Sequence, residues 1–118
     1  MKTILVVGRD WKFRALLRAQ LREESYEALG FETLEEAAAE LGRGSLLPAA
    51  LVFDTTDSSV AELQPQLAAL AESRRAGPVL VVAAPQEHIE APGLRVLRRP
   101  LRLEEVVAAV KSLTTAHN

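Results

Sequence analysis

The sequence predicts an α/β fold of three layers, in which helices cover both faces of one doubly wound, parallel, five-stranded sheet. Two observations lead to this prediction. Short apolar runs alternate with helical patterns along the whole chain, and such alternation is typical of parallel strands joined by right-handed helical crossovers. The runs are also continuously apolar, as expected of strands that are buried on both faces of a sheet.

The first half of the chain supplies two strands and two helices. TILVVG (3–8) is rich in β-branched residues and predicts the first strand, and YEAL (26–29) predicts a weaker second one. Thr33 and Glu36 have the spacing of a capping box, which predicts a helix from there to about Leu41. A helix over about 11–24 is predicted by apolar residues at helical spacing: Phe13, Leu16, Leu17 and Leu21.

The second half supplies three strands and two clear helices. The runs ALVFD (50–54), PVLVVA (78–83) and LRVL (94–97) predict the strands. Pro65 suits the first turn of the helix that follows 50–54, because a missing N–H matters little there. That helix is marked by Leu63, Leu67 and Leu70, and the closing helix by Leu103, Val106, Val107, Val110 and Leu113.

The segment between the fourth and fifth strands is short. Residues 84–93 read APQEHIEAPG and include two prolines. At 3.6 residues per turn they hold at most about two helical turns. We therefore expect the fold to have a shortened fourth helix.

Composition excludes several classes of function. The 118 residues suffice for one domain (1–118), and a net charge of −2 gives no general attraction to nucleic acid or to an anionic membrane. No cysteine is present, which excludes disulfides and thiolate metal sites. The two histidines, His88 and His117, are far apart, and neither a metal site nor a cofactor is predicted. No signal peptide or spanning segment is recognisable, so we expect a cytoplasmic protein.

Charged and polar residues follow the predicted strands directly. In doubly wound sheets, ligands bind outside the carboxyl ends of the strands, where the strand order reverses. We therefore expect one pocket at this edge. Its candidate residues are Gly8, Arg9, Asp10, Asp54, Thr55, Ala83, Arg98, Arg99 and Pro100.

The order of these strand ends resembles the receiver (CheY-like, flavodoxin-like) domain of bacterial two-component response regulators, over essentially the whole chain. In that family the first strand ends in two acidic residues that help to hold a divalent cation, and the third ends in the aspartate that accepts a phosphoryl group. The fourth ends in Thr or Ser, and the fifth in Lys-Pro. Here VVGRD, LVFDTT, VVAAP and LRRPL occupy those places. The resemblance puts Asp54 at the phosphoacceptor position and matches Pro100.

The chain departs from the family pattern through most of this pocket. Mg²⁺ needs carboxylate oxygens and waters in a near-octahedral array, and a guanidinium at the acidic pair supplies no ligand and repels the ion. Without the Thr or Ser hydroxyl at the end of the fourth strand, a phosphoryl oxygen loses a hydrogen-bond donor. An arginine in place of the lysine after the fifth strand keeps the charge but is not equivalent to it. The departures are Gly8 and Arg9 at the acidic pair (with Asp10 one place late), Ser58 for the usual proline, Ala83 for the hydroxyl residue and Arg99 for the lysine.

A specific hypothesis follows from the charges. A guanidinium can bind a carboxylate through two parallel hydrogen bonds, so Arg9, Arg99 or both are predicted to pair with Asp54 and to hold the site without metal or phosphate. The alternative is that Arg9 points to solvent and that Asp54 is a relic or a helix-capping carboxylate.

Two further features are candidates for partner binding. Trp11 begins the first helix beside the pocket, and exposed tryptophan is favoured at binding hot spots; packing against the neighbouring loop is the alternative. The basic cluster of Arg95, Arg98, Arg99 and Arg102 could bind an acidic partner or form a solvated edge. Without interleaved aromatics, it does not predict nucleic-acid binding.

The sequence therefore predicts an atypical receiver domain that is not an enzyme. It is expected to act in signal transduction by binding other signalling proteins, with no direct contact to nucleic acid or membrane and with homodimerisation left open. One alternative is a receiver phosphorylated at Asp54 by a histidine kinase. Another is a sensor of anionic small molecules that uses Arg9 and Arg99.

Overall fold

A computed structural model of the chain describes residues 1–115 and confirms the predicted fold. All five strands described are parallel and form one sheet in the order β2-β1-β3-β4-β5. The elements are β1 (Thr3–Val7), α1 (Trp11–Glu23), β2 (Glu27–Phe31), α2 (Leu34–Gly42), β3 (Ala50–Asp54), α3 (Val60–Ser73), β4 (Val79–Ala83), β5 (Leu94–Arg98) and α4 (Leu103–Thr115).

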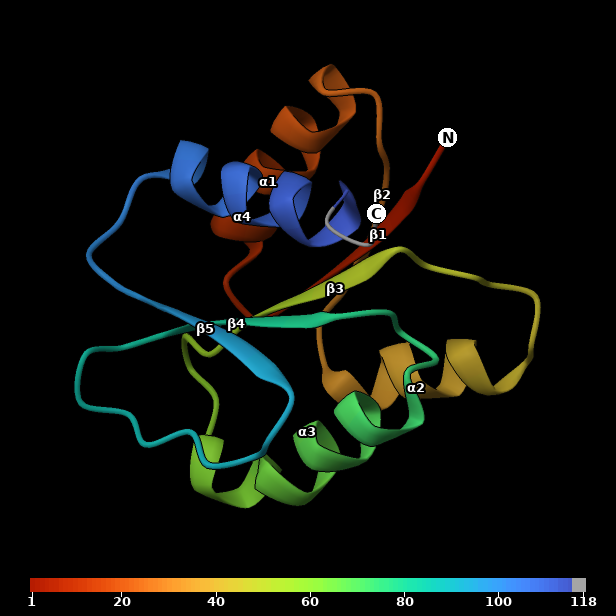
Figure 1. Cartoon of the computed structure of the whole chain (residues 1–118). Coiled ribbons are helices and arrows are strands. Elements are labelled where there is room, and N and C mark those ends of the chain that lie inside the picture. The colour runs from red at the N-terminus through yellow and green to blue at the C-terminus, as the bar shows by residue number, and fades with distance from the viewer. Residues whose placement is uncertain (116–118) are drawn as a thin grey trace.

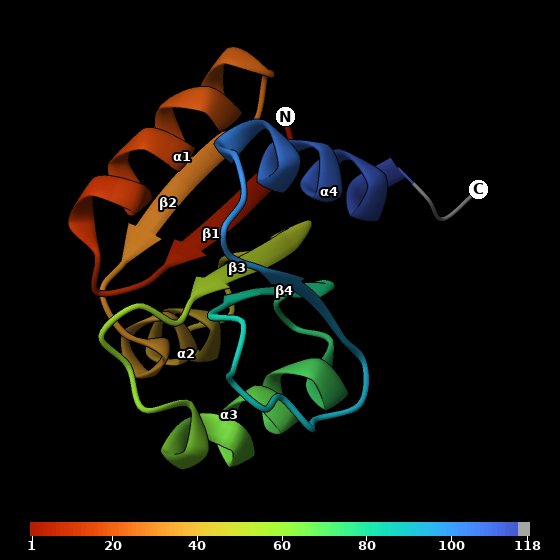
Figure 2. The same cartoon turned by 90° about the vertical axis from the view of Figure 1, so that its left-hand side faces the viewer.

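Helices cover both faces of the sheet. Helices α1 and α4 contact each other over one face, and α2 and α3 lie over the other (Figures 1 and 2). Because successive side chains of a strand point to opposite faces, Ile4 and Val6 join the core under α1 and α4, whereas Leu5 and Val7 join the core under α2 and α3. The continuous apolar runs thus reflect burial on both faces. Within the described residues, no helix is both long and apolar enough to cross a membrane.

Helix α3 begins earlier than predicted. It starts at Val60, so Pro65 lies inside the helix and not in its first turn. The amides of Glu62 and Leu63 donate to the carbonyl oxygen of Ser59, which opens the helix one turn upstream of the leucine pattern. Burial of Val60, which is 6% exposed, accounts for the extension and offsets the hydrogen bond that Pro65 cannot make.

The predicted shortened helix between β4 and β5 is wrong: residues 84–93 form a loop with no helix. The amide of Glu87 donates to the carbonyl oxygen of Ala84 in a single turn. Side chains from elsewhere bind three carbonyl oxygens of the loop: Arg98 donates to those of Ala84 and Glu87, and Gln64 donates to that of His88. Pro92 near the end of the segment also opposes helix growth.

The start of α2 gives a first testable prediction. The Glu36 amide donates to Thr33 Oγ1 at 3.1 Å, and the Glu36 carboxylate reaches back to the amide of Glu32 at 3.0 Å, one residue before the cap. Thr33→Ala should lower the free energy of unfolding by about 1 kcal/mol because it removes the capping oxygen. Thr33→Ser keeps that oxygen and is the control. Equal losses for both variants in urea denaturation would contradict a capping role.

Candidate functional site

The centre of the predicted pocket is an ion pair between Asp54 and Arg99. Asp54 ends β3 and is 2% exposed, and Arg99 directly follows β5. Arg99 Nη1 lies 2.7 Å from Asp54 Oδ1, which is the pairing predicted for Arg99. The contact uses one carboxylate oxygen, so it is not the two-bond arrangement that a guanidinium can form.

Arg99 also holds the neighbouring strand ends together. Its Nη1 donates to the carbonyl oxygen of Val82 in β4 at 3.1 Å, and its Nη2 donates to Thr55 Oγ1 at 3.3 Å. Its backbone amide donates to the carbonyl oxygen of Ala83. The Arg99 side chain is 30% exposed, so it lies at the rim of the pocket while its guanidinium nitrogens bind groups inside it. Pro100 follows it through a cis peptide bond.

Asp54 is only partly compensated. Its Oδ1 also accepts a hydrogen bond from the Thr56 hydroxyl at 3.2 Å, but its Oδ2 is buried and has no hydrogen-bond partner among residues 1–115. Burial raises the pKa of Asp54 above its ordinary value, and Asp10 raises this pKa slightly further. The Arg99 guanidinium and Thr56 lower the pKa without cancelling the effect of burial.

Gly8 allows the ends of β1 and β3 to approach closely. A Cβ atom at this position would lie 3.1 Å from Asp54 Cβ and 3.2 Å from the Asp54 carbonyl oxygen. The Gly8 carbonyl oxygen accepts a hydrogen bond from Arg14 Nη1 on α1. Sequence reasoning missed Arg14. Its position in the first turns of α1, the helix that follows β1, could have indicated that it lies near the end of this strand.

Of the two arginines predicted to pair with Asp54, Arg99 does so and Arg9 does not. Arg9 is exposed, as the alternative expected, and lines a small cavity on the α2 side of the edge together with Glu32 and Glu35. Asp10 next to it is the N-cap of α1, where its Oδ1 accepts from the Lys12 amide at 3.1 Å. Asp10, which lies one residue after the position of the family's acidic pair, thus caps a helix.

The arrangement does not fit a Mg²⁺ ion. Mg²⁺ binds through carboxylate oxygens and water, but Asp54 Oδ1 is taken by Arg99, the Asp10 carboxylate caps α1 and Gly8 has no side chain. Among the buried side-chain oxygens of residues 1–115, Asp54 Oδ2 alone has no hydrogen-bond partner. Between residues 1 and 115 there is no cluster of three or more metal-ligating side chains; His117 lies outside this range.

A second carboxylate, which sequence reasoning missed, lies at the end of β4. Ala83 is buried and has no hydroxyl. The nearby hydroxyl is that of Thr55, the residue after Asp54, and it donates to Glu87 Oε1 at 2.5 Å. The Ala84 amide donates to the same oxygen at 2.7 Å. No motif marks Glu87, because its place depends on the loop that replaces the expected helix.

The predicted partner-binding residues lie on the surface. Trp11 is 64% exposed at the start of α1, which agrees with a surface position and not with packing against the loop. Arg95 and Arg102 are also exposed. Arg98 is exposed too, but its guanidinium is used to hold the loop carbonyls of Ala84 and Glu87. The basic cluster is therefore partly structural.

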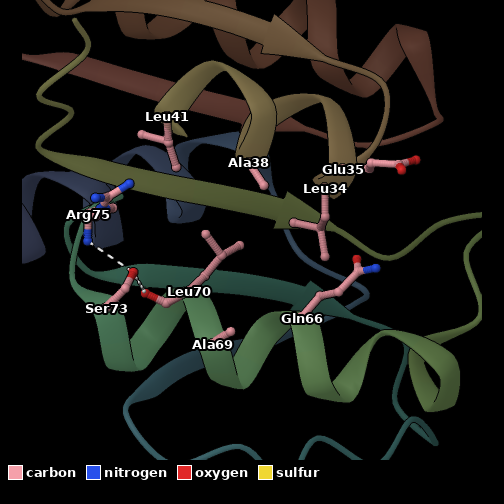
Figure 3. Close-up of a pocket in the computed structure, with 9 residues that line it drawn as sticks. All are labelled: Leu34, Glu35, Ala38, Leu41, Gln66, Ala69, Leu70, Ser73 and Arg75. Carbon is pink, nitrogen blue, oxygen red and sulfur yellow. Dashed lines mark hydrogen bonds between the residues drawn. The ribbon is translucent and has the colours of Figure 1, made fainter. Parts of the chain in front are cut away.

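The molecule has another hollow, away from this edge. A cavity of about 370 Å³ separates α2 from α3, and its lining is mostly apolar. Leu34 and Leu41 of α2 face Leu70 of α3 across it, with Arg75 at one end (Figure 3). None of the residues predicted from the strand ends lines this cavity.

Comparison with known proteins identifies the fold. No protein-family model and no curated protein matches the chain by sequence. Solved structures do match, with TM-scores of 0.76 for the receiver domain of the Francisella response regulator 1452 (18% identity, all of both chains covered) and for the Vibrio cholerae chemotaxis protein CheY4 (15% identity, 96% of this chain and 98% of that one). The fold is that of a receiver domain.

A third receiver structure was solved in an activated form. The beryllofluoride-activated NtrC4 receiver domain dimer is 21% identical, with a TM-score of 0.75 and full coverage of both chains. This chain keeps the receiver fold without the helix between β4 and β5, so the fold tolerates a loop at that place.

Proposed function

We propose that this protein is an atypical receiver domain of two-component signalling, which binds other signalling proteins and is not an enzyme. In this proposal the Arg99 guanidinium takes the place of the divalent cation, so the domain works without Mg²⁺-dependent phosphorylation. The observation that carries the proposal is the ion pair between Arg99 and the buried Asp54.

The chemistry of phosphoryl transfer supports this proposal. Transfer depends on positioning and on neutralisation of the developing charge, which metal ions usually provide. Here one oxygen of Asp54 is hydrogen-bonded to Arg99, and the other is buried beside Gly8. The Asp10 carboxylate is used at the start of α1. The remaining groups offer a metal ion too few oxygens to bridge an incoming phosphoryl group.

Partner binding is assigned to the exposed side chains near this edge. Trp11 presents a large apolar surface to solvent, and exposed tryptophan often anchors a protein interface. Arg95 and Arg102 add positive charge on the β5 side, which suits an acidic partner surface. The NtrC4 receiver forms a dimer, and a second copy of this chain is one partner that the proposal includes.

The anion-sensor alternative receives less support from the geometry. It requires Arg9 and Arg99 to face one ligand. Arg9 lines a cavity with Glu32 and Glu35, whereas Arg99 is bound to Asp54. The two guanidinium groups therefore do not form a joint site.

Chemical phosphorylation tests the proposal. The protein is incubated with acetyl phosphate, or with beryllofluoride, in the presence of Mg²⁺, and modification is followed by intact mass and by amide NMR shifts. Asp54→Asn is the matched control, because it removes the acceptor and preserves side-chain shape. We expect the two proteins to behave alike. Modification of the wild-type protein that Asp54→Asn abolishes would show a working phosphoacceptor and overturn the proposal.

A further inference from the structure

The carboxylate of Glu87 lies where hydrogen-bond donors from the strand ends meet. Its Oε1 accepts from the Thr55 hydroxyl at 2.5 Å and from the Ala84 amide at 2.7 Å. The Thr55 oxygen in turn accepts from Arg99 Nη2 at 3.3 Å. The Thr55 hydroxyl and the Ala84 amide thus meet at one acidic oxygen, and the Arg99 guanidinium is linked to that oxygen through Thr55.

This set of donors suits an oxyanion in general. A backbone N–H, a hydroxyl and a guanidinium are the groups that proteins use to hold carboxylates, phosphates and sulfates, and bonds to a charged acceptor are the stronger ones. The carboxylate that accepts from the Thr55 hydroxyl and the Ala84 amide belongs to the chain itself and reaches back from the loop between β4 and β5.

The loop does not depend on the Glu87 side chain for its shape. The Glu87 amide donates to the Ala84 carbonyl oxygen at 3.2 Å and closes the turn. Arg98 Nη1 donates to the carbonyl oxygens of Ala84 and Glu87 at 3.0 and 2.6 Å. These bonds stay in place when the side chain is shortened, so its removal should leave the donors where they are.

We propose that these donors form an oxyanion-binding site, which the chain fills with its own Glu87 carboxylate and which a free tetrahedral oxyanion occupies once that carboxylate is removed. The inference rests on the proposed function and deepens it. The Glu87 carboxylate binds donors beside Asp54, just as the Arg99 guanidinium binds the Asp54 carboxylate. Inorganic phosphate is the probe for the site, with sulfate as a second tetrahedral anion.

The test compares phosphate binding by four proteins. Phosphate is titrated without divalent metal into the wild type, Glu87→Ala, Glu87→Gln and Glu90→Ala, and binding is measured by calorimetry and by the amide shift of Ala84. Glu90→Ala removes the same charge from the same loop, where Glu90 pairs with the exposed His88 at 2.6 Å. We expect Glu87→Ala to bind phosphate at least tenfold more tightly than the wild type, and Glu90→Ala to bind it as the wild type does.

Glu87→Gln separates an emptied site from a lost charge. Glutamine keeps an oxygen that can accept from Thr55 and Ala84, so it should bind phosphate no more tightly than the wild type. If Glu87→Ala fails to fold, Glu87→Ser carries the same expectation. Phosphate affinity that is unchanged in the shortened variants would overturn the inference. An affinity raised equally in Glu90→Ala or Glu87→Gln would overturn it too, because the gain would then come from the lost charge and not from an emptied site.

The two proposals fail in different experiments. Since the phosphate titration contains no Mg²⁺ and no phosphoryl donor, its outcome does not depend on whether Asp54 can be phosphorylated. Modification of Asp54 would overturn the proposed function, and phosphate binding that is indifferent to Glu87 would overturn this inference.

Discussion

Arg99→Met should lower the free energy of unfolding by about 3 kcal/mol at pH 7, because removing one partner of a buried ion pair leaves the other charge uncompensated. Asp54 is 2% exposed, and its Oδ2 already has no hydrogen-bond partner within the described residues. Without Arg99, its Oδ1 keeps only the Thr56 hydroxyl. Methionine preserves much of the side-chain volume, so the loss reports on charge and hydrogen bonding.

The loss should depend on pH in a defined direction. A carboxyl whose pKa is higher in the folded than in the unfolded protein reduces stability as the pH rises through that range. The pKa of Asp54 lies above its ordinary value of 3.8, and Arg99 is one of the groups that lower it. Arg99→Met therefore raises this pKa further. The stability difference between the two proteins should be full at neutral pH and should shrink as the pH falls toward 4.

Urea denaturation of a double-mutant cycle measures this coupling. In an Asp54→Asn background there is no charge to compensate, and Arg99→Met should cost less than about 1 kcal/mol. Arg9→Met removes an exposed arginine at the same edge and should change stability by no more than about 0.5 kcal/mol. If Arg99→Met costs as much in the Asp54→Asn background as in the wild type, the ion pair does not explain its role.

Gly77→Ala should also lower the free energy of unfolding by about 3 kcal/mol, through backbone strain. Gly77 has a φ angle of 71°, and an added Cβ would lie 2.6 Å from the carbonyl oxygen of Ala49. This contact joins the segments that enter β3 and β4, where the Leu51 amide donates to the Pro78 carbonyl oxygen. A side chain would force these segments apart at the start of two central strands.

Gly44→Ala is the matched control for this strain. Gly44 has a φ angle of 81°, but an added Cβ would meet no atom within 4 Å. Its loss should be about 1 kcal/mol, the cost of the left-handed conformation alone. The two variants are compared by urea denaturation at one pH. Equal losses would mean that the close approach to Ala49 contributes nothing.

Much of the fold could be predicted because burial leaves a strong pattern in the sequence. Strands buried on both faces must be apolar throughout, and 50–54 and 79–83 are fully buried. The pairing of Arg99 with Asp54 followed from topology, since the carboxyl ends of parallel strands share one edge of the sheet, and Arg99 reaches from the end of β5 past β4 to the end of β3. The start of α3 was missed because Val60 lies outside the leucine pattern and Pro65 suggested a first turn.

The rest of the site depends on where long side chains reach. Arg9 and Arg99 have the same chemistry, yet Arg9 lines an exposed cavity beside α2 whereas Arg99 binds Asp54. Arg14 and Glu87 act through contacts at sequence separations of six and thirty-two residues. Such contacts leave no periodic signal. The loop at 84–93 could be recognised as short, but not as a segment whose carbonyl oxygens are bound by Arg98.

The loop before β5 has a consequence for local unfolding. β5 lies at the edge of the sheet, contains only half-buried and exposed residues, and has no helix between it and β4. Edge segments with few buried contacts are the first to open in native-state fluctuations. Because Arg99 directly follows β5, fraying of that strand withdraws the guanidinium from Asp54. Access to the carboxylate is then governed by a minor, partly opened population of the native protein.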